Sequence, residues 1–99
     1  MLKVLIRRKF KPGKEQEVRV LLNQMRSDAM NVEGYISAET YFGHDDPNQM
    51  LVISTWQTFE NWRSWKESEI RTINATTMME MYQDGPTTYE EYVLPKIKR

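Results

Sequence analysis

The sequence predicts an α+β fold in which one antiparallel sheet carries two helices on one face. Short segments of alternating apolar and polar residues occur at both ends of the chain and twice in succession near its middle, and this period indicates strands. Two other segments place apolar residues three and four positions apart, which is the period of a helix. The resulting order, β-α-β-β-α-β, is the ferredoxin-like arrangement.

The first two elements are expected to be a strand over residues 2–10 and a helix over residues 14–32. In the strand, apolar residues alternate with basic ones, which predicts one buried face. That face consists of Leu2, Val4, Ile6 and Phe10. Pro12-Gly13 ends the strand and precedes a helix with a single apolar stripe. The stripe consists of Val18, Leu21, Leu22, Met25 and Ala29.

Two strands in the middle of the chain are expected to pair as an antiparallel hairpin. They cover residues 34–43 and 49–56, and a polar turn that contains His44 joins them. Strict alternation along the first of these strands would place Tyr35 and Ala38 on opposite faces of the sheet.

The second helix follows at once, in the segment LVISTWQTFENWRSWKES, and holds two of the three tryptophans of the chain. Asn61 and Trp65 stand four residues apart, so they share one side of this helix. Phe59 and Trp62 are expected to pack into the core. The helix is expected to break near Ser68.

The last third of the chain is expected to hold a helical turn over residues 69–73, a methionine-rich segment over residues 74–84 and a strand over residues 87–94. The methionines are expected at the rim of a pocket or in a contact between protomers, because methionine fills irregular gaps. They are Met78, Met79 and Met81. The chain is therefore a single domain, residues 1–99, with a core over about residues 1–95 and a basic tail over residues 96–99.

Both faces of the predicted sheet carry apolar and aromatic residues, although the two helices can cover only one of them. A second copy of the chain is the simplest cover for the other face. We therefore expect a homodimer in which two sheets pack face to face or curl into a barrel.

Composition argues against several classes of protein. Fourteen Lys and Arg balance fourteen Asp and Glu, so nucleic acid is not an expected partner. The chain has no cysteine, which excludes disulfides and thiolate metal sites. No apolar run approaches the roughly 20 residues of a membrane-spanning helix, and the start of the chain lacks the pattern of a signal peptide. A cytoplasmic protein without a membrane partner is expected.

Several of these segments together resemble the antibiotic biosynthesis monooxygenase (ABM) domain. They are the helix opened by Pro-Gly, the EGY that enters the second strand, the strand that ends in Trp56, and FENWRSWKES. The resemblance extends over roughly residues 1–95 and implies a dimeric α+β barrel with a small-molecule pocket between sheet and helices. Members of this family include cofactor-free monooxygenases of phenolic polyketides or quinols, haem-degrading enzymes, an isomerase of a signal molecule and proteins without a known substrate.

The resemblance implies that Asn61 and Trp65 form a catalytic pair, because the polyketide monooxygenases carry an Asn and a Trp at this spacing. Asn61 could donate a hydrogen bond to a developing oxyanion. Trp65 could stack on the substrate ring and donate its indole N–H. In this chemistry the electron-rich substrate itself reduces O₂, so no cofactor and no metal are expected.

The haem-degrading members use a histidine about ten residues after that tryptophan and an asparagine on the first strand. Asn74-Ala75-Thr76 and Ile6-Arg7-Arg8 stand in those two places here. Binding or degradation of haem is therefore a less favoured alternative.

Four further residues are weaker candidates for the site. His44 is the only histidine and could act as a base if its loop reaches the pocket, although a histidine in an acidic turn is more often a surface residue. Arg7 could neutralise a substrate anion, and Trp62 and Tyr35 could line the pocket around a small aromatic molecule. The main alternative is a dimer that binds such a molecule without catalysis, in which the tryptophans are core residues and Asn61 is solvated.

Overall fold

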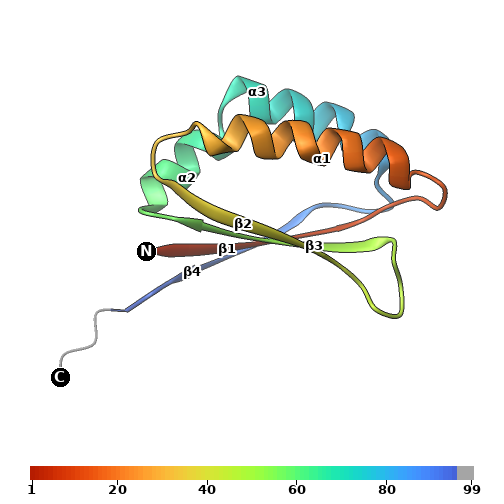
Figure 1. Ribbon diagram of the computed structural model, residues 1–99, viewed down its shortest axis with the longest axis horizontal. Helices are drawn as coiled ribbons and strands as arrows, with labels where there is room; N and C mark the ends of the chain where they lie inside the picture. Colours follow the sequence, from red (N-terminus) through yellow and green to blue (C-terminus); the bar gives the residue numbers. More distant parts are fainter. Residues whose placement is uncertain (96–99) are drawn as a thin grey trace.

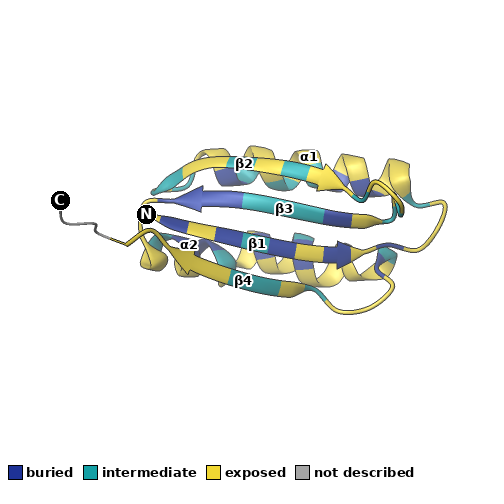
Figure 2. Ribbon diagram, turned by 90° about the horizontal axis from the view of Figure 1, so that it is seen from below, coloured by how far each residue is buried: buried dark blue, intermediate teal, exposed yellow. Residues whose placement is uncertain are grey.

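Four antiparallel strands form one sheet in the computed structural model, which describes residues 1–95 (Figure 1). The helices all lie on one face of this sheet and leave the other face bare (Figures 1 and 2). The strands are β1 (Leu2–Lys9), β2 (Tyr35–Phe42), β3 (Gln49–Trp56) and β4 (Thr88–Val93), in the spatial order β2-β3-β1-β4. The predicted α+β, ferredoxin-like arrangement is confirmed, while the basic tail, residues 96–99, lies outside the described residues.

Two helices face the sheet. The long helix α1 (Glu15–Met30) turns the apolar stripe predicted from its period toward the sheet, with Val18, Leu21 and Ala29 buried and Leu22 and Met25 partly buried. The short helix α2 (Phe59–Lys66) follows β3 directly, and the hydroxyl of Thr58 caps it by accepting a hydrogen bond from Asn61 N at 3.1 Å. Among the described residues, no helix is long and apolar enough to cross a membrane.

Three short helical segments connect α2 to β4. Ser68 ends the turn after α2 and caps α3 (Glu69–Arg71), since its hydroxyl accepts from Arg71 N at 3.3 Å. The chain continues as a π-helical segment, η1 (Thr72–Met78), and a 3₁₀ turn, η2 (Glu80–Tyr82). The predicted break near Ser68 is present, and π-helical turns of this kind are often found next to functional sites.

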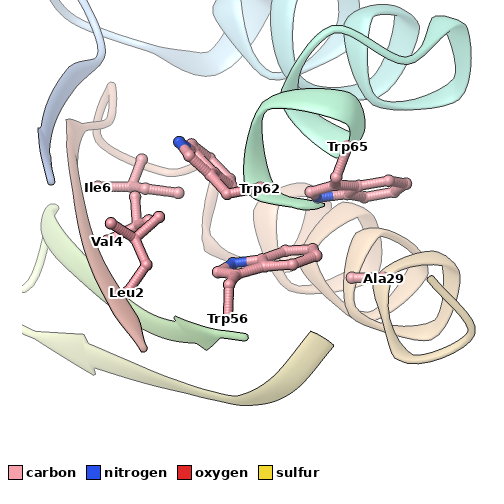
Figure 3. Close-up of a cluster of buried hydrophobic side chains, with 7 residues drawn as sticks. All are labelled: Leu2, Val4, Ile6, Ala29, Trp56, Trp62 and Trp65. Atoms are coloured by element: carbon pink, nitrogen blue, oxygen red, sulfur yellow. The ribbon is translucent and has the colours of Figure 1, made fainter. Parts of the chain in front are cut away.

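The core between the two layers consists of two clusters. The first lies beneath α2, where tryptophans from β3 and α2 pack against the apolar face of β1 (Figure 3). Its members are Leu2, Val4, Ile6, Ala29, Trp56, Trp62 and Trp65. The second cluster lies at the other end of α1 and consists of Phe10, Val18, Leu21, Met50 and Met79.

Two expectations about the core were wrong. Phe59 is the first residue of α2 and is 41% exposed, because its position at the helix start turns it away from the sheet. Met79 is fully buried in the second cluster and lies neither at a pocket rim nor on a surface. Met78 and Met81 are exposed.

A β-bulge in β2 overturns the strict alternation expected for this strand. Tyr35 pairs with Trp56 and Ser37 pairs with Thr55, so Ile36 is an extra residue without a partner on β3. Beyond the bulge the two faces exchange, and Tyr35 and Ala38 therefore lie on the same face, toward the helices.

Gly34 lets the loop before β2 pass directly against α2. Its φ is +85°, in the region that favours glycine. A Cβ at this position would lie 2.5 Å from Asn61 Cβ and closer still to the amide group of that side chain. Gly34 thus fixes the distance between α2 and the start of β2.

We expect Gly34→Ala to destabilise the protein more than Gly13→Ala does. Both glycines have positive φ, +85° and +81°, which costs an L-residue about 1–2 kcal/mol. Only the new methyl group at residue 34 also collides with a neighbour, since nothing lies within 4 Å of a Cβ on Gly13. Urea denaturation of both variants measures the difference. Equal losses of free energy would show that the close approach of Asn61 has no energetic weight.

Candidate functional site

A cavity of about 70 Å³ lies between the sheet and the helices. Its walls combine aromatic side chains with arginines. The sheet side contributes Arg8, Tyr35 and Trp56, and the helical side contributes Trp62, Trp65 and Arg71. None of the described residues that line it is an aspartate, a glutamate or a histidine.

The aromatic walls are held in fixed orientations by contacts with one another. Tyr35 meets Trp56 edge to face, with ring centroids 5.5 Å apart, and Trp56 and Trp62 are 5.8 Å apart. Trp56 Nε1 donates to Ser54 Oγ at 3.2 Å, and Trp62 Nε1 donates to Glu91 Oε1 at 3.2 Å. Two of the three indole N–H groups are thus already bonded within the protein.

Trp65 differs from the other two tryptophans. It is 8% exposed, and its indole lies beside those of Trp56 and Trp62 (Figure 3). Its Nε1 takes part in none of the side-chain hydrogen bonds found within residues 1–95. Trp65 therefore lines the cavity with an indole whose N–H donor has no partner in the described residues.

Arg71 reaches the cavity from the end of α3 and is only 4% exposed. Its Nη2 donates to the hydroxyl of Tyr89 at 3.1 Å. The guanidinium also lies over the rings of Trp62 and Tyr89, at 5.1 and 5.5 Å from their centroids. These cation–π contacts offset part of the free energy lost when the charge leaves water.

Arg8 reaches the same cavity from β1 and is also 4% exposed. Its Nε and Nη2 are buried without any hydrogen-bond partner in the described chain. Burial lowers the pKa of Arg8 from its ordinary value to about 10, with Tyr89 acting in the opposite direction and the nearby charge of Arg71 lowering it further. Arg8 is thus a buried cation whose donors are not satisfied by the protein.

A third arginine, Arg26 of α1, also lines the cavity but is exposed. It donates from Nη2 to Thr40 Oγ1 at 3.0 Å. No ion pair formed within residues 1–95 involves Arg8, Arg26 or Arg71. The cavity is therefore a site of uncompensated positive charge.

The structure brings three of the candidate residues together in the cavity and places a fourth, Asn61, close to it. Tyr35, Trp62 and Trp65 all line the cavity. Asn61 does not line it: its Oδ1 accepts a hydrogen bond from Thr58 Oγ1 at 2.7 Å, and its side chain packs against Gly34. The Asn61–Trp65 spacing thus puts one residue in the cavity and the other at the capped start of α2.

The other two candidates lie away from the cavity. Arg7 points to the bare face of the sheet, where it pairs with Glu90 of β4. The side chain of His44 is fully exposed in the β2–β3 turn and lies 3.0 Å from Asp45 Oδ1. Neither side chain reaches the cavity in this conformation.

Sequence reasoning missed Arg8 and Arg71. For Arg8 the signal was present, because residue 8 falls on the buried face of β1 in the alternation of Leu2, Val4 and Ile6. A charged residue at such a position is a candidate for function. For Arg71 no local signal exists, since its burial depends on where α3 packs.

Arg8→Met is expected to raise the free energy of unfolding by about 1–3 kcal/mol at pH 7, because it removes buried donors that lack partners and keeps an apolar stem. Arg7→Met, on the bare face, is the control and should change stability little. Urea denaturation measures both effects. A marked loss of stability in Arg8→Met would contradict the description of Arg8 as an unsatisfied cation.

The difference in free energy of unfolding between Arg8→Met and the wild type should also depend on pH. Because the pKa of Arg8 is lowered to about 10 in the folded protein, the unfolded chain binds more protons from about pH 10 up to the ordinary range of an arginine. The wild-type protein therefore gains stability relative to the variant as pH rises through this range. Denaturation at pH 7 and pH 11 tests the sign, and a constant difference would contradict it.

The sequence matches the family model described as antibiotic biosynthesis monooxygenase over residues 1–72. Comparison with curated proteins gives no match. A solved structure described as an antibiotic biosynthesis monooxygenase is similar with a TM-score of 0.86 at 17% identity, over 97% of this chain and 100% of that one. A conserved protein from Methanosarcina mazei Go1 gives a TM-score of 0.85 at 19% identity, over 92% and 89% of the two chains.

A third similar structure is a variant of SnoaB, described as a cofactor-independent oxygenase from Streptomyces nogalater. Its TM-score is 0.83 at 10% identity, over 97% of this chain and 94% of that one. At such identities these structures show a shared fold and no more. The family model, however, matches 72 of the 99 residues. The chain therefore belongs to the antibiotic biosynthesis monooxygenase family.

Proposed function

We propose that this protein is a cofactor-independent monooxygenase that uses O₂ to oxidise a small phenolic or quinol-type aromatic compound. The observation that carries the proposal is the buried cavity, whose aromatic walls and free donors suit a flat, electron-rich anion. Membership of the family supports it, and so does the similarity in fold to SnoaB, which is described as a cofactor-independent oxygenase.

The reaction proceeds from the deprotonated phenol. The phenolate passes an electron to O₂, the resulting pair combines at a ring carbon that carries a hydrogen, and a peroxide forms there. Loss of water from the peroxide leaves a quinone, so that one oxygen atom enters the product and the other leaves as water. The substrate supplies all the electrons, and the protein supplies position, exclusion of water and charge.

Binding and deprotonation of the substrate can be assigned to residues in the cavity. The indole N–H of Trp65 donates to the phenolic oxygen, and the indole rings of Trp62 and Trp65 hold the substrate ring. The positive charge of Arg8 and Arg71 lowers the pKa of the phenol on binding, in the way that a nearby cation favours any anion. The phenolic proton then goes to solvent, which removes the need for a carboxylate or imidazole base at the cavity wall.

Asn61 has a different role in this proposal. It packs against Gly34 and is bonded to Thr58 in the cap of α2, so it positions the helix that carries Trp65. Its own amide group does not contact the substrate. Replacement of Asn61 should therefore reduce turnover less than replacement of Trp65.

Oxygen consumption by the purified protein with naphthols, anthrones and hydroquinones tests the proposal. Trp65→Phe keeps a ring but loses the N–H donor, and should lower kcat about tenfold, the equivalent of one hydrogen bond of about 1.4 kcal/mol. Trp65→Ala should lower it further, Asn61→Ala less, and His44→Ala should leave it unchanged. Turnover unaffected by both Trp65 variants would place the reaction elsewhere. Binding of these compounds without any oxygen uptake would favour a non-catalytic binding protein.

We also propose that the bare face of the sheet is covered by a second copy of the chain. The strand register and the pleat of the sheet place apolar and aromatic side chains on this face, between flanking charges. They are Leu5, Tyr41, Leu51, Ile53 and Tyr92. Figure 2 shows the molecule from the side of this face, and no helix from residues 1–95 covers it. An apolar strip of this kind favours a partner with the same surface.

Ile53→Asp is expected to dissociate such a dimer, because it buries a charge at the centre of the interface. Val20→Asp is the matched control, since Val20 is 63% exposed on α1, on the opposite side of the molecule. Light scattering after size-exclusion chromatography should give twice the chain mass of 11.9 kDa for the wild type and the control, and one chain mass for Ile53→Asp. A monomeric wild type would overturn the proposal.

A further inference from the structure

Two buried guanidinium groups share one cavity without an acidic partner. Arg8 and Arg71 are each 4% exposed, and neither forms an ion pair with any residue from 1 to 95. The remaining four residues of the sequence carry no acidic side chain. Buried charges in folded proteins are normally paired, because an uncompensated charge loses the solvation of water and gains nothing in return. Within the described residues, the two charges therefore leave a site that suits a negatively charged group.

The two donors left unsatisfied on Arg8 indicate the shape of that group. Nε and Nη2 lie on the same edge of the guanidinium, and together they form the fork that binds both oxygens of a carboxylate. A carboxylate offers a separate oxygen to each donor in two parallel hydrogen bonds, whereas a single phenolate oxygen would have to be shared between them. Arg71 already donates to Tyr89 and is stacked on aromatic rings, so it adds fixed positive charge behind the fork.

The size of the cavity limits the rest of the ligand. About 70 Å³ is small beside the roughly 300–1,000 Å³ of pockets that enclose drug-sized ligands. A compound with one aromatic ring suits this space better than a polycyclic one. The tryptophan walls offer a face to that ring, and Trp65 offers a donor to a hydroxyl on it.

We infer that the cavity binds a hydroxylated single-ring aromatic acid, with its carboxylate on the Nε–Nη2 edge of Arg8. Arg71 strengthens the interaction by its charge, and the ring lies among Trp56, Trp62 and Trp65. The oxidation of such an acid rests on the proposed function, whereas the recognition of its carboxylate does not.

Calorimetric titration with 2,5-dihydroxybenzoate and 2,5-dihydroxybenzamide tests the inference. The two compounds have the same ring, hydroxyls and size, and differ only in the charge and the oxygens of one group. The acid should bind the wild-type protein at least tenfold more tightly than the amide. Equal affinity for acid and amide, or no measurable binding of the acid, would overturn the inference.

Variants locate the carboxylate. Arg8→Met should abolish the preference for the acid, and Arg8→Lys, which keeps the charge but loses the fork, should retain only part of it. Arg7→Met, one residue away but on the bare face, should keep the full preference. A thermal shift provides a second readout: the acid should raise the Tm of the wild type and of Arg7→Met, but not that of Arg8→Met. A full preference in Arg8→Met would overturn the assignment to Arg8.

The same compounds separate this inference from the proposed function. Preferential binding of the acid without oxygen uptake would leave the carboxylate site intact and remove the oxidation of this substrate class. Oxidation of acid and amide at equal affinity would support the oxygenase and overturn the carboxylate site.

Discussion

The packing of Trp62 and Trp65 against the sheet is the contact on which both the fold and the cavity depend. These side chains join α2 to β1 and β3, and each contributes about 1.5–3 kcal/mol or more through burial alone. Their rings also form the wall that a ligand would touch. The α2 helix is held in place at its start by the Thr58 cap and the close approach of Gly34. The geometry of the cavity is therefore as rigid as the core of which it is part.

The two buried arginines of the cavity, Arg8 and Arg71, lower the stability that this packing provides. Arg71 recovers part of its lost hydration through Tyr89 and two aromatic faces. Arg8 also interacts with Tyr89, but this does not offset its burial, and two of its donors have no partner in the described chain. A core selected for stability alone would place an apolar side chain at residue 8, as the chain does at Ile6 in β1 and at Phe10 directly after it. Sites that bind charged ligands commonly reduce stability in this way, because the groups prepared for the ligand are unsatisfied without it.

The sequence was sufficient for the fold because its periodic segments were long and unambiguous. It was insufficient for the site, because two of the deciding features are not periodic and the third, the burial of Arg8, rests on the alternation of a single strand. The extra residue at Ile36 carries no turn signal, yet it moves Tyr35 to the cavity face. Arg7 and Arg8 are adjacent and chemically identical, and only the alternation of β1 distinguishes the exposed one from the buried one. The burial of Arg71 depends on tertiary packing of α3, which no local pattern reports.

The register of β1 explains why Arg8 remains buried despite its cost. Moving it to the bare face would require a shift of the strand by one residue, which would also turn Leu2, Val4 and Ile6 out of the core. Those three side chains contribute about 1.5–3 kcal/mol each, more in sum than the few kcal/mol expected for burying one cation beside polar neighbours. The apolar residues of β1 therefore hold the arginine in the cavity, although two of its buried donors have no partner there.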